Sequence, residues 1–97
     1  MTRILWSPQA LRDLESIHAY IVQDSELYAE LVIHRILGSV ARLAEFPESG
    51  RVVPERNDRA LREVIVRPYR VVYRLRPGLA EIATVFRASR LFPAGTE

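Results

Sequence analysis

The sequence predicts a single α+β domain, residues 1–97, in which a helical hairpin packs on one face of a small, mainly antiparallel sheet. Two long segments in the first half repeat their apolar residues every three or four positions, as amphipathic helices do. Three short segments in the second half are rich in β-branched and aromatic residues, as strands are. The length of 97 residues suits one hydrophobic core.

The chain opens with a strand and a first helix. The apolar run "RILW", Arg3 to Trp6, predicts the strand. Ser7 is a suitable N-cap, and Pro8 fits the first helical position because its missing N–H has no helical partner there. The helix is expected to bury one stripe of side chains: Leu11, Leu14, Ile17 and Ile21.

A second helix is predicted from Asp24 or Ser25 to about Phe46. Its apolar period runs through Leu27, Leu31 or Val32, Ile36, Val40 and Leu43. Because the connection is short, the two helices are expected to form an antiparallel hairpin. Ile33, Leu37 and Ala41 add apolar surface beyond one buried stripe, which indicates either a docking surface or a fully buried helix.

Residues 46–60 read as an irregular loop, and three strands follow it. The strands are expected at Leu61 to Val66, Tyr69 to Leu75 and Ala80 to Phe86, with breaks at Arg67-Pro68 and Pro77-Gly78. Short connections favour an antiparallel meander, so the element order is β-α-α-β-β-β.

The stretch "RPYRVVYRL" places its arginines on one face of a strand. Side chains alternate along a strand, so Arg70, Arg74 and Arg76 share a face opposite Tyr69 and Tyr73. With helices on the tyrosine face, the arginines are expected on the open side of the sheet, unburied. Arg62, Arg87 and Arg90 are candidates for further members of this cluster. The alternative is an ordinary solvated face with Glu63 and Glu81 as partners.

Composition limits the possible chemistry. All 14 basic residues are arginine and cysteine is absent, which excludes lysine nucleophiles, disulfides and thiolate metal ligands. Residues 1–50 hold four arginines and seven acids, and residues 51–97 hold ten arginines and five acids, so the second half carries the positive charge. That asymmetry favours an acidic or nucleic-acid partner. We expect no membrane span, no secretory signal and a cytoplasmic location.

Four segments resemble one known family: "WSPQALRDLESIHAYI", "LAEFPESGRVVPE", "LREVIVRPYRVVYRL" and "EIATVFRASR". Together they resemble the RelE/ParE superfamily, the toxins of bacterial type II toxin–antitoxin (plasmid stabilisation) systems. The pair "FPESGR" and "PYRVVYR" is most similar to the ParE branch. The resemblance implies the same β-α-α-β-β-β fold.

The ParE resemblance implies inhibition of DNA gyrase, without cofactor or metal, and neutralisation by a ParD-like, ribbon-helix-helix antitoxin. Operator DNA would be bound only through that antitoxin. The implied target-binding residues are Arg70, Arg74, Arg87 and Arg90. The positions expected to bind antitoxin are Leu27, Leu31, Ile33 and Leu37. Arg87 and Ala88 stand where ParE proteins commonly have histidine and glycine, which bears on toxicity and not on the fold.

Two alternatives stay open at the level of sequence. A RelE-like protein would cleave messenger RNA on the ribosome, using Arg70, Arg87, Arg90 and Arg62. No tyrosine or histidine follows Phe86 to act as acid or base, and arginine almost never loses its proton. The second alternative is a non-toxic member that acts only as an antitoxin-binding co-repressor.

Overall fold

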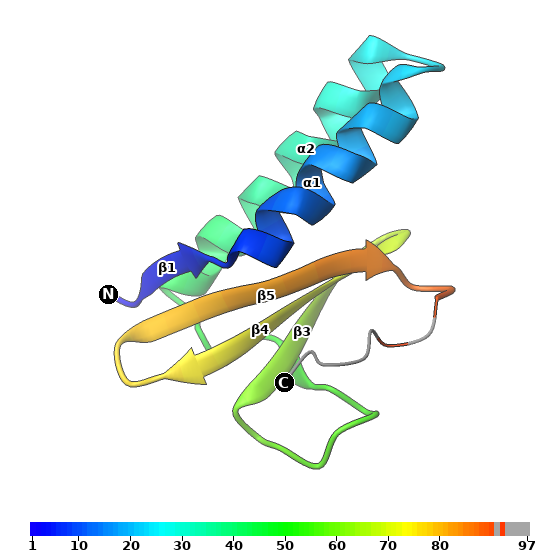
Figure 1. Cartoon of the computed structure of the whole chain (residues 1–97). Coiled ribbons are helices and arrows are strands. Elements are labelled where there is room, and N and C mark those ends of the chain that lie inside the picture. The colour runs from blue at the N-terminus through cyan, green and yellow to red at the C-terminus, as the bar shows by residue number, and fades with distance from the viewer. Residues whose placement is uncertain (91, 93–97) are drawn as a thin grey trace.

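The computed structural model describes residues 1–90 and 92, and it confirms the predicted α+β architecture. A helical hairpin covers one face of a twisted five-stranded sheet and projects past its end (Figure 1). Its elements are β1 (Arg3–Trp6), α1 (Pro8–Val22), α2 (Glu26–Ala41), the 3₁₀ turn η1 (Arg42–Ala44), β2 (Arg51–Val52), β3 (Leu61–Val66), β4 (Tyr69–Arg76) and β5 (Leu79–Arg87).

The sheet has the order β1-β5-β4-β3-β2. β1 runs parallel to β5, and the other neighbours are antiparallel, so the mainly antiparallel prediction is confirmed. The turn between β4 and β5 contains Gly78 with a φ of +70°, a conformation that glycine adopts without strain. A bulge in the β4–β5 pairing leaves Ala83 without a directly opposite residue.

Capping residues set the start of both helices. The Ser7 hydroxyl accepts a hydrogen bond from the Ala10 amide at 3.0 Å, and Ser25 caps α2 in the same way through Tyr28. α2 ends at Ala41, earlier than the predicted Phe46, because the chain tightens there into the 3₁₀ turn.

The main core lies between the hairpin and the sheet. From α2 it takes Ala29, Val32, Ile36 and Val40, and from β4 it takes Tyr69, Val71 and Tyr73. The tyrosine face of β4 is therefore buried, as predicted. One part of the α1 prediction was wrong: Leu11 is 50% exposed and Ala10 is fully buried in its place. The small Ala10 side chain occupies the buried position where α1 begins.

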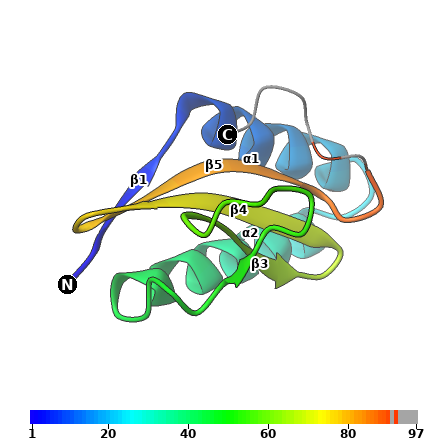
Figure 2. The ribbon, with the colours of Figure 1, turned by 90° about the horizontal axis from the view of Figure 1, so that it is seen from below.

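A second, smaller core lies on the opposite face of the sheet. It contains Val53, Leu61, Val72 and Phe86, with Phe92 packed against it. The loop after β2 passes over this face, as Figure 2 shows from below. The loop was predicted to be irregular, and β2 within it was missed because a two-residue strand has no readable period. This loop covers the face of the sheet that was predicted to be open.

Candidate functional site

Arg70 lies at the centre of an ion-pair cluster on the sheet face away from the helices. Its Nε donates to Glu63 Oε1 at 2.6 Å, and its two terminal nitrogens donate to the two carboxylate oxygens of Glu55 at 2.7 Å each. Arg51 Nε approaches the other oxygen of Glu63 at 2.5 Å. The guanidinium of Arg70 is thus held by two carboxylates.

The charges of this cluster are largely shielded from water and shift one another's pKa values. Only 6% of Arg70 and 1% of Glu63 is exposed, so neither charge has much water around it. The hydrogen bond from Arg70 lowers the pKa of Glu55 from its ordinary 4.5 to about 2. The same bond to Glu55 raises the pKa of Arg70, with Glu63 adding to the effect. Arg70 also lies over the Phe86 ring, 5.2 Å from its centroid.

The prediction that this face is open and its arginines unburied was wrong for Arg70. Val53 is fully buried in the second core, and it anchors the loop that brings Glu55 onto the guanidinium. The same loop supplies Asp58, whose carboxylate meets Arg74 at 3.0 Å. A hydrogen bond from the Ala60 amide and the contact with Arg74 both lower the pKa of Asp58.

Strand register separates Arg62 and Arg87 from the arginines of β4. Arg62 pairs with Tyr73 and therefore points to the helical face, where it donates to the carbonyls of Glu48 and Gly50. Arg87 pairs with Tyr69, again on the helical face, and lies 5.9 Å from the centroid of that ring. Arg62 and Arg87 therefore do not belong to the arginine cluster that they were candidates to join.

Three arginines remain on the predicted face: Arg70, Arg74 and Arg76. The last of these meets Glu81 at 3.5 Å, and both side chains are partly exposed. Glu63 and Glu81 are thus partners, as the alternative expected, but the pair of Arg70 with Glu63 is buried and not solvated. Arg87 and Arg90, at and just after the end of β5, are exposed.

Sequence reasoning missed Glu55 and Asp58. Both lie in the loop of residues 53–60, which carries no period that would orient a side chain. The excess of arginine over acid on the strands was the only available signal that the loop should supply carboxylates. Their role follows from the path of the loop, which the sequence does not specify.

The helical residues expected to bind a partner are mostly exposed. The exposed fractions are 82% for Leu27, 53% for Leu31 and 42% for Leu37, whereas Ile33 is half-buried. Tyr20 and Tyr28 near the hairpin tip are also exposed. The hairpin therefore carries apolar surface that the sheet does not cover.

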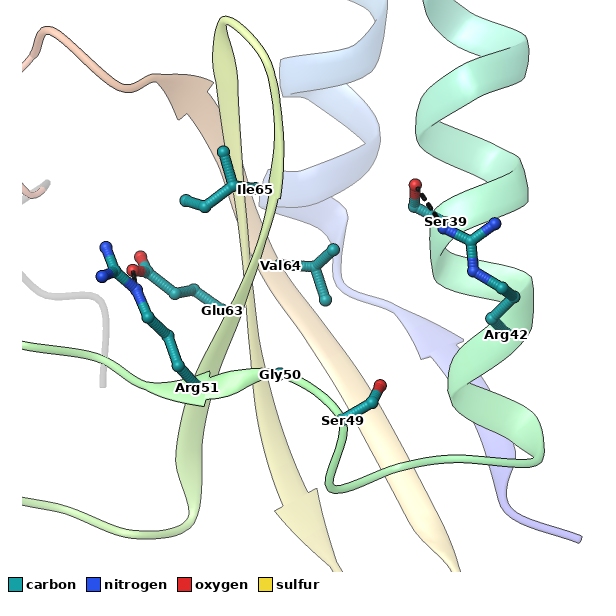
Figure 3. A pocket seen from close by; sticks show the side chains of 8 residues that line it. All are labelled: Ser39, Arg42, Ser49, Gly50, Arg51, Glu63, Val64 and Ile65. Atoms are coloured by element: carbon teal, nitrogen blue, oxygen red, sulfur yellow. Dashed lines mark hydrogen bonds and ion pairs between the residues drawn. The ribbon is translucent and has the colours of Figure 1, made fainter.

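A groove runs between α2 and the β3 side of the sheet. It consists of two adjoining hollows of about 610 and 270 Å³ that share Ser39, Arg42 and Ile65. Figure 3 shows the smaller hollow, in which Val64 of β3 points toward Ser39 of α2 and Arg42 of η1, whereas Ile65 points to the other side of β3. This groove was not predicted, because it depends on how far the helix stands from the strand.

Comparison with known proteins decides the family. Residues 4–92 match the family model described as the ParE toxin of the type II toxin–antitoxin system, parDE. The chain belongs to the ParE toxin family. It is therefore a toxin of a type II toxin–antitoxin system, and membership implies a cognate antitoxin as its partner.

A named protein and a solved structure are both similar to this ParE-family chain. The protein named toxin RelE2 from Caulobacter vibrioides is 38% identical over 92 residues, covering 94% of this chain and all of the relative. A solved structure titled as the chromosomal ParDE toxin–antitoxin system from P. aeruginosa matches the fold with a TM-score of 0.74 at 21% identity, covering 90% of this chain and 96% of the other.

Within residues 1–90 and 92, no helix combines the length and the apolar character needed to cross a membrane. In the same part of the chain, no three histidine, aspartate or glutamate side chains lie close enough together to hold a metal ion.

Proposed function

We propose that this toxin acts as a protein ligand that inhibits DNA gyrase in the cytoplasm, and that its antitoxin neutralises it. The observation that carries the proposal is that Arg70 is buried and already bonded to two carboxylates. The two carboxylates that hold Arg70 already accept hydrogen bonds from its Nε and both terminal nitrogens. Their negative charge would also repel a phosphate at that position. An arginine in this state is suited to holding structure together.

Among residues 1–90 and 92, the carboxylates in this cluster are poorly suited to act as a general base, because arginines hold both of them and the hydrogen bond from Arg70 lowers the pKa of Glu55 to about 2. Tyr73 lies on the helical face, where its hydroxyl donates to the Pro47 carbonyl at 2.7 Å, and burial raises its pKa. His18 lies on α1 and meets Glu30 of α2 at 2.9 Å, and His34 lines the helical groove. Cleavage of RNA needs a base and a phosphate holder within reach of each other. The described residues favour binding over catalysis.

Arg87 and Arg90 are the exposed arginines proposed to contact the target. Arg70 and Arg74 lie on the sheet face opposite to Arg87 and are proposed as positioning residues, because they hold the loop of residues 53–60 through Glu55 and Asp58. A partner such as gyrase would meet the end of β5. The double charge reversal Arg87→Glu and Arg90→Glu is therefore expected to remove inhibition without unfolding the protein.

The exposed leucines of α2 are proposed to receive the antitoxin. Leu27 and Leu31 are one turn apart on the same helix face, and Leu37 lies further along α2. Apolar anchors on a helix suit an amphipathic helix from a partner. A ribbon-helix-helix antitoxin would bring operator DNA to the complex.

A supercoiling assay with purified gyrase tests the target. Wild-type toxin is expected to block supercoiling or to accumulate cleaved DNA, and the Arg87→Glu, Arg90→Glu variant is expected to do neither. Arg12→Glu, an exposed arginine on α1, is the matched control and should inhibit as the wild type does. Normal supercoiling at saturating toxin would contradict the proposal.

RNA cleavage is the second candidate, because the relative from Caulobacter vibrioides carries the name toxin RelE2. Translating ribosomes incubated with the toxin distinguish the two. Intact messenger RNA supports the gyrase proposal, whereas cleavage that is lost in the Arg87→Glu, Arg90→Glu variant supports the RelE-like activity. Growth unaffected by expression without antitoxin would instead indicate a non-toxic co-repressor.

A further inference from the structure

β1 forms one border of the sheet, and within residues 1–90 and 92 it pairs only with β5 (Figure 1). Two hydrogen bonds mark the side of β1 that faces β5. The Arg3 amide donates to the Gly78 carbonyl at 3.0 Å, and the Ser7 amide donates to the Ile82 carbonyl at 2.9 Å. Because backbone groups alternate between the two sides of a strand, every second residue from Arg3 faces β5 and the others face outward.

The outward residues of β1 are Ile4 and Trp6, and no strand of residues 1–90 and 92 meets their N–H and C=O groups. The same alternation directs the Thr2 amide outward, and this amide already donates to the Ala44 carbonyl at 2.9 Å. At the other end of the strand, Pro8 has no N–H and opens α1. The uncovered edge is therefore a short window at Ile4 and Trp6 that is closed at both ends.

This window is self-complementary about Leu5, which lies between its two outward residues. When a second copy of the chain approaches in the antiparallel direction, Ile4 of each copy lies opposite Trp6 of the other, and each pair exchanges both N–H···O bonds. The two Leu5 residues then form a non-hydrogen-bonded pair on the two-fold axis, with Cα atoms about 4.5 Å apart. A single two-fold axis thus satisfies the open backbone groups of both copies.

Apolar side chains beside this window are exposed in the single chain. Leu5 is 48% exposed and Phe46 is 60% exposed. Phe46 comes two residues after the carbonyl that accepts from Thr2, so it lies beside the start of β1. In the two-fold arrangement, Thr2 lies near Pro8 of the second copy. Phe46 would therefore lie near the start of the other α1, where Leu11 is also exposed.

We propose that two copies of this chain associate through β1 into a two-fold dimer with one continuous sheet. Closed two-fold dimers are the commonest homo-oligomers. Charge does not oppose the contact, because Arg3 lies opposite Ser7 of the other copy. The two Arg3 residues are about 13 Å apart along the paired strands, which exceeds the Debye length of about 10 Å at 0.1 M salt.

The length of the window favours a second copy over an extended segment of another protein. A longer strand laid along β1 would meet η1 at one end, where Ala44 holds Thr2, and α1 at the other. A second β1 has the same short length and turns away into its own α1 after Trp6. The dimer does not depend on gyrase as the target of the toxin.

Sedimentation equilibrium of the toxin alone tests the dimer. The apparent mass should rise from that of one chain towards that of two as the concentration rises from about 1 μM to about 1 mM, the range of a small interface. Leu5→Glu places two carboxylates against each other on the axis and should hold the mass at one chain. Ile65→Glu is the matched control on the opposite side of the sheet, because Ile65 of β3 is 40% exposed, and it should dimerise as the wild type does.

Cysteine cross-linking tests the register, because the chain has no cysteine of its own. A Cα separation of about 4.5 Å at Leu5 falls within the range of about 4.4–6.8 Å that disulfides span. Under mild oxidation, Leu5→Cys should therefore run at twice the mass of one chain on a non-reducing gel. Ile65→Cys, with an equally accessible position on β3, should run mainly as the single chain.

Four results would overturn the proposal. They are the mass of one chain at every concentration, a dimer that persists in Leu5→Glu, equal cross-linking by the two cysteine variants, and amides of Ile4 and Trp6 that resist hydrogen exchange only in the complex co-purified with antitoxin. The last result would assign this edge to a strand of the antitoxin. Because no gyrase is present, a failure here leaves the gyrase proposal standing, and normal supercoiling in the gyrase assay leaves the dimer standing.

Discussion

Replacing Arg70 by alanine tests the role of the buried ion pair. The substitution leaves the carboxylate of Glu63 fully buried without its main partner. Breaking a buried pair by removing one partner costs about 3–5 kcal/mol. Arg51 still reaches Glu63, and Glu55, 39% exposed, can turn to water, which places the expected cost at the lower end, about 3 kcal/mol.

That cost is a large share of the stability of a domain of 97 residues, for which about 5–15 kcal/mol is typical. At roughly 4–8 °C per kcal/mol, the melting temperature should fall by about 12–24 °C. Thermal unfolding followed by circular dichroism measures this shift.

Arg76→Ala is the matched control on the same strand and face. Arg76 is 54% exposed and meets Glu81 at 3.5 Å, so its loss should cost less than about 1 kcal/mol. The double variant Glu63→Leu, Arg70→Met should recover most of the stability lost in Arg70→Ala, because no buried charge is left unpaired. Equal melting temperatures for Arg70→Ala and Arg76→Ala would refute the argument.

Further predictions concern pH and two glycines. The pKa of Glu55 is lower in the folded protein, about 2, than its ordinary 4.5, so its contribution to stability is complete above pH 4.5 and is lost as the pH falls toward 2. Urea unfolding at several pH values should show a smaller loss across this range for Glu55→Gln than for the wild type. Gly50→Ala should destabilise the fold, because the added Cβ would lie 2.5 Å from the Tyr73 hydroxyl oxygen. Gly38→Ala has open space within α2 and should raise stability by up to about 1 kcal/mol, and a melting curve that ranks these two variants the other way would contradict both arguments.

The alternation in β4 was predicted correctly, because a strand has only two faces and the tyrosines mark the buried one. The positions of Arg62 and Arg87 were not, because each belongs to another strand and its face depends on the residue opposite. Register pairs Arg62 with Tyr73 and Arg87 with Tyr69, which turns both away from Arg70. A shift by one residue would have reversed the outcome.

The helices, too, were predicted only in part from the sequence. The apolar period predicted that α1 and α2 form a hairpin and which side of α2 is buried, through Ile36 and Val40. The exchange of Leu11 for Ala10 at the buried position depends on the rotation of α1 over the sheet. Hydrophobic period alone does not fix that rotation when neighbouring residues are both apolar.

By itself, the sequence determined the fold class and the order of the elements, because local periods and turn residues are written in consecutive positions. The toxin superfamily was indicated by the resemblance of four segments to a known family. Only the tertiary structure decided that Arg70 is buried and paired, since its partners Glu55 and Glu63 come from a loop and a neighbouring strand. It also decided that, within residues 1–90 and 92, no strand pairs with the edge of β3 at Ile65. Contacts between residues far apart in the chain depend on strand register and loop path, and neither leaves a pattern in the sequence.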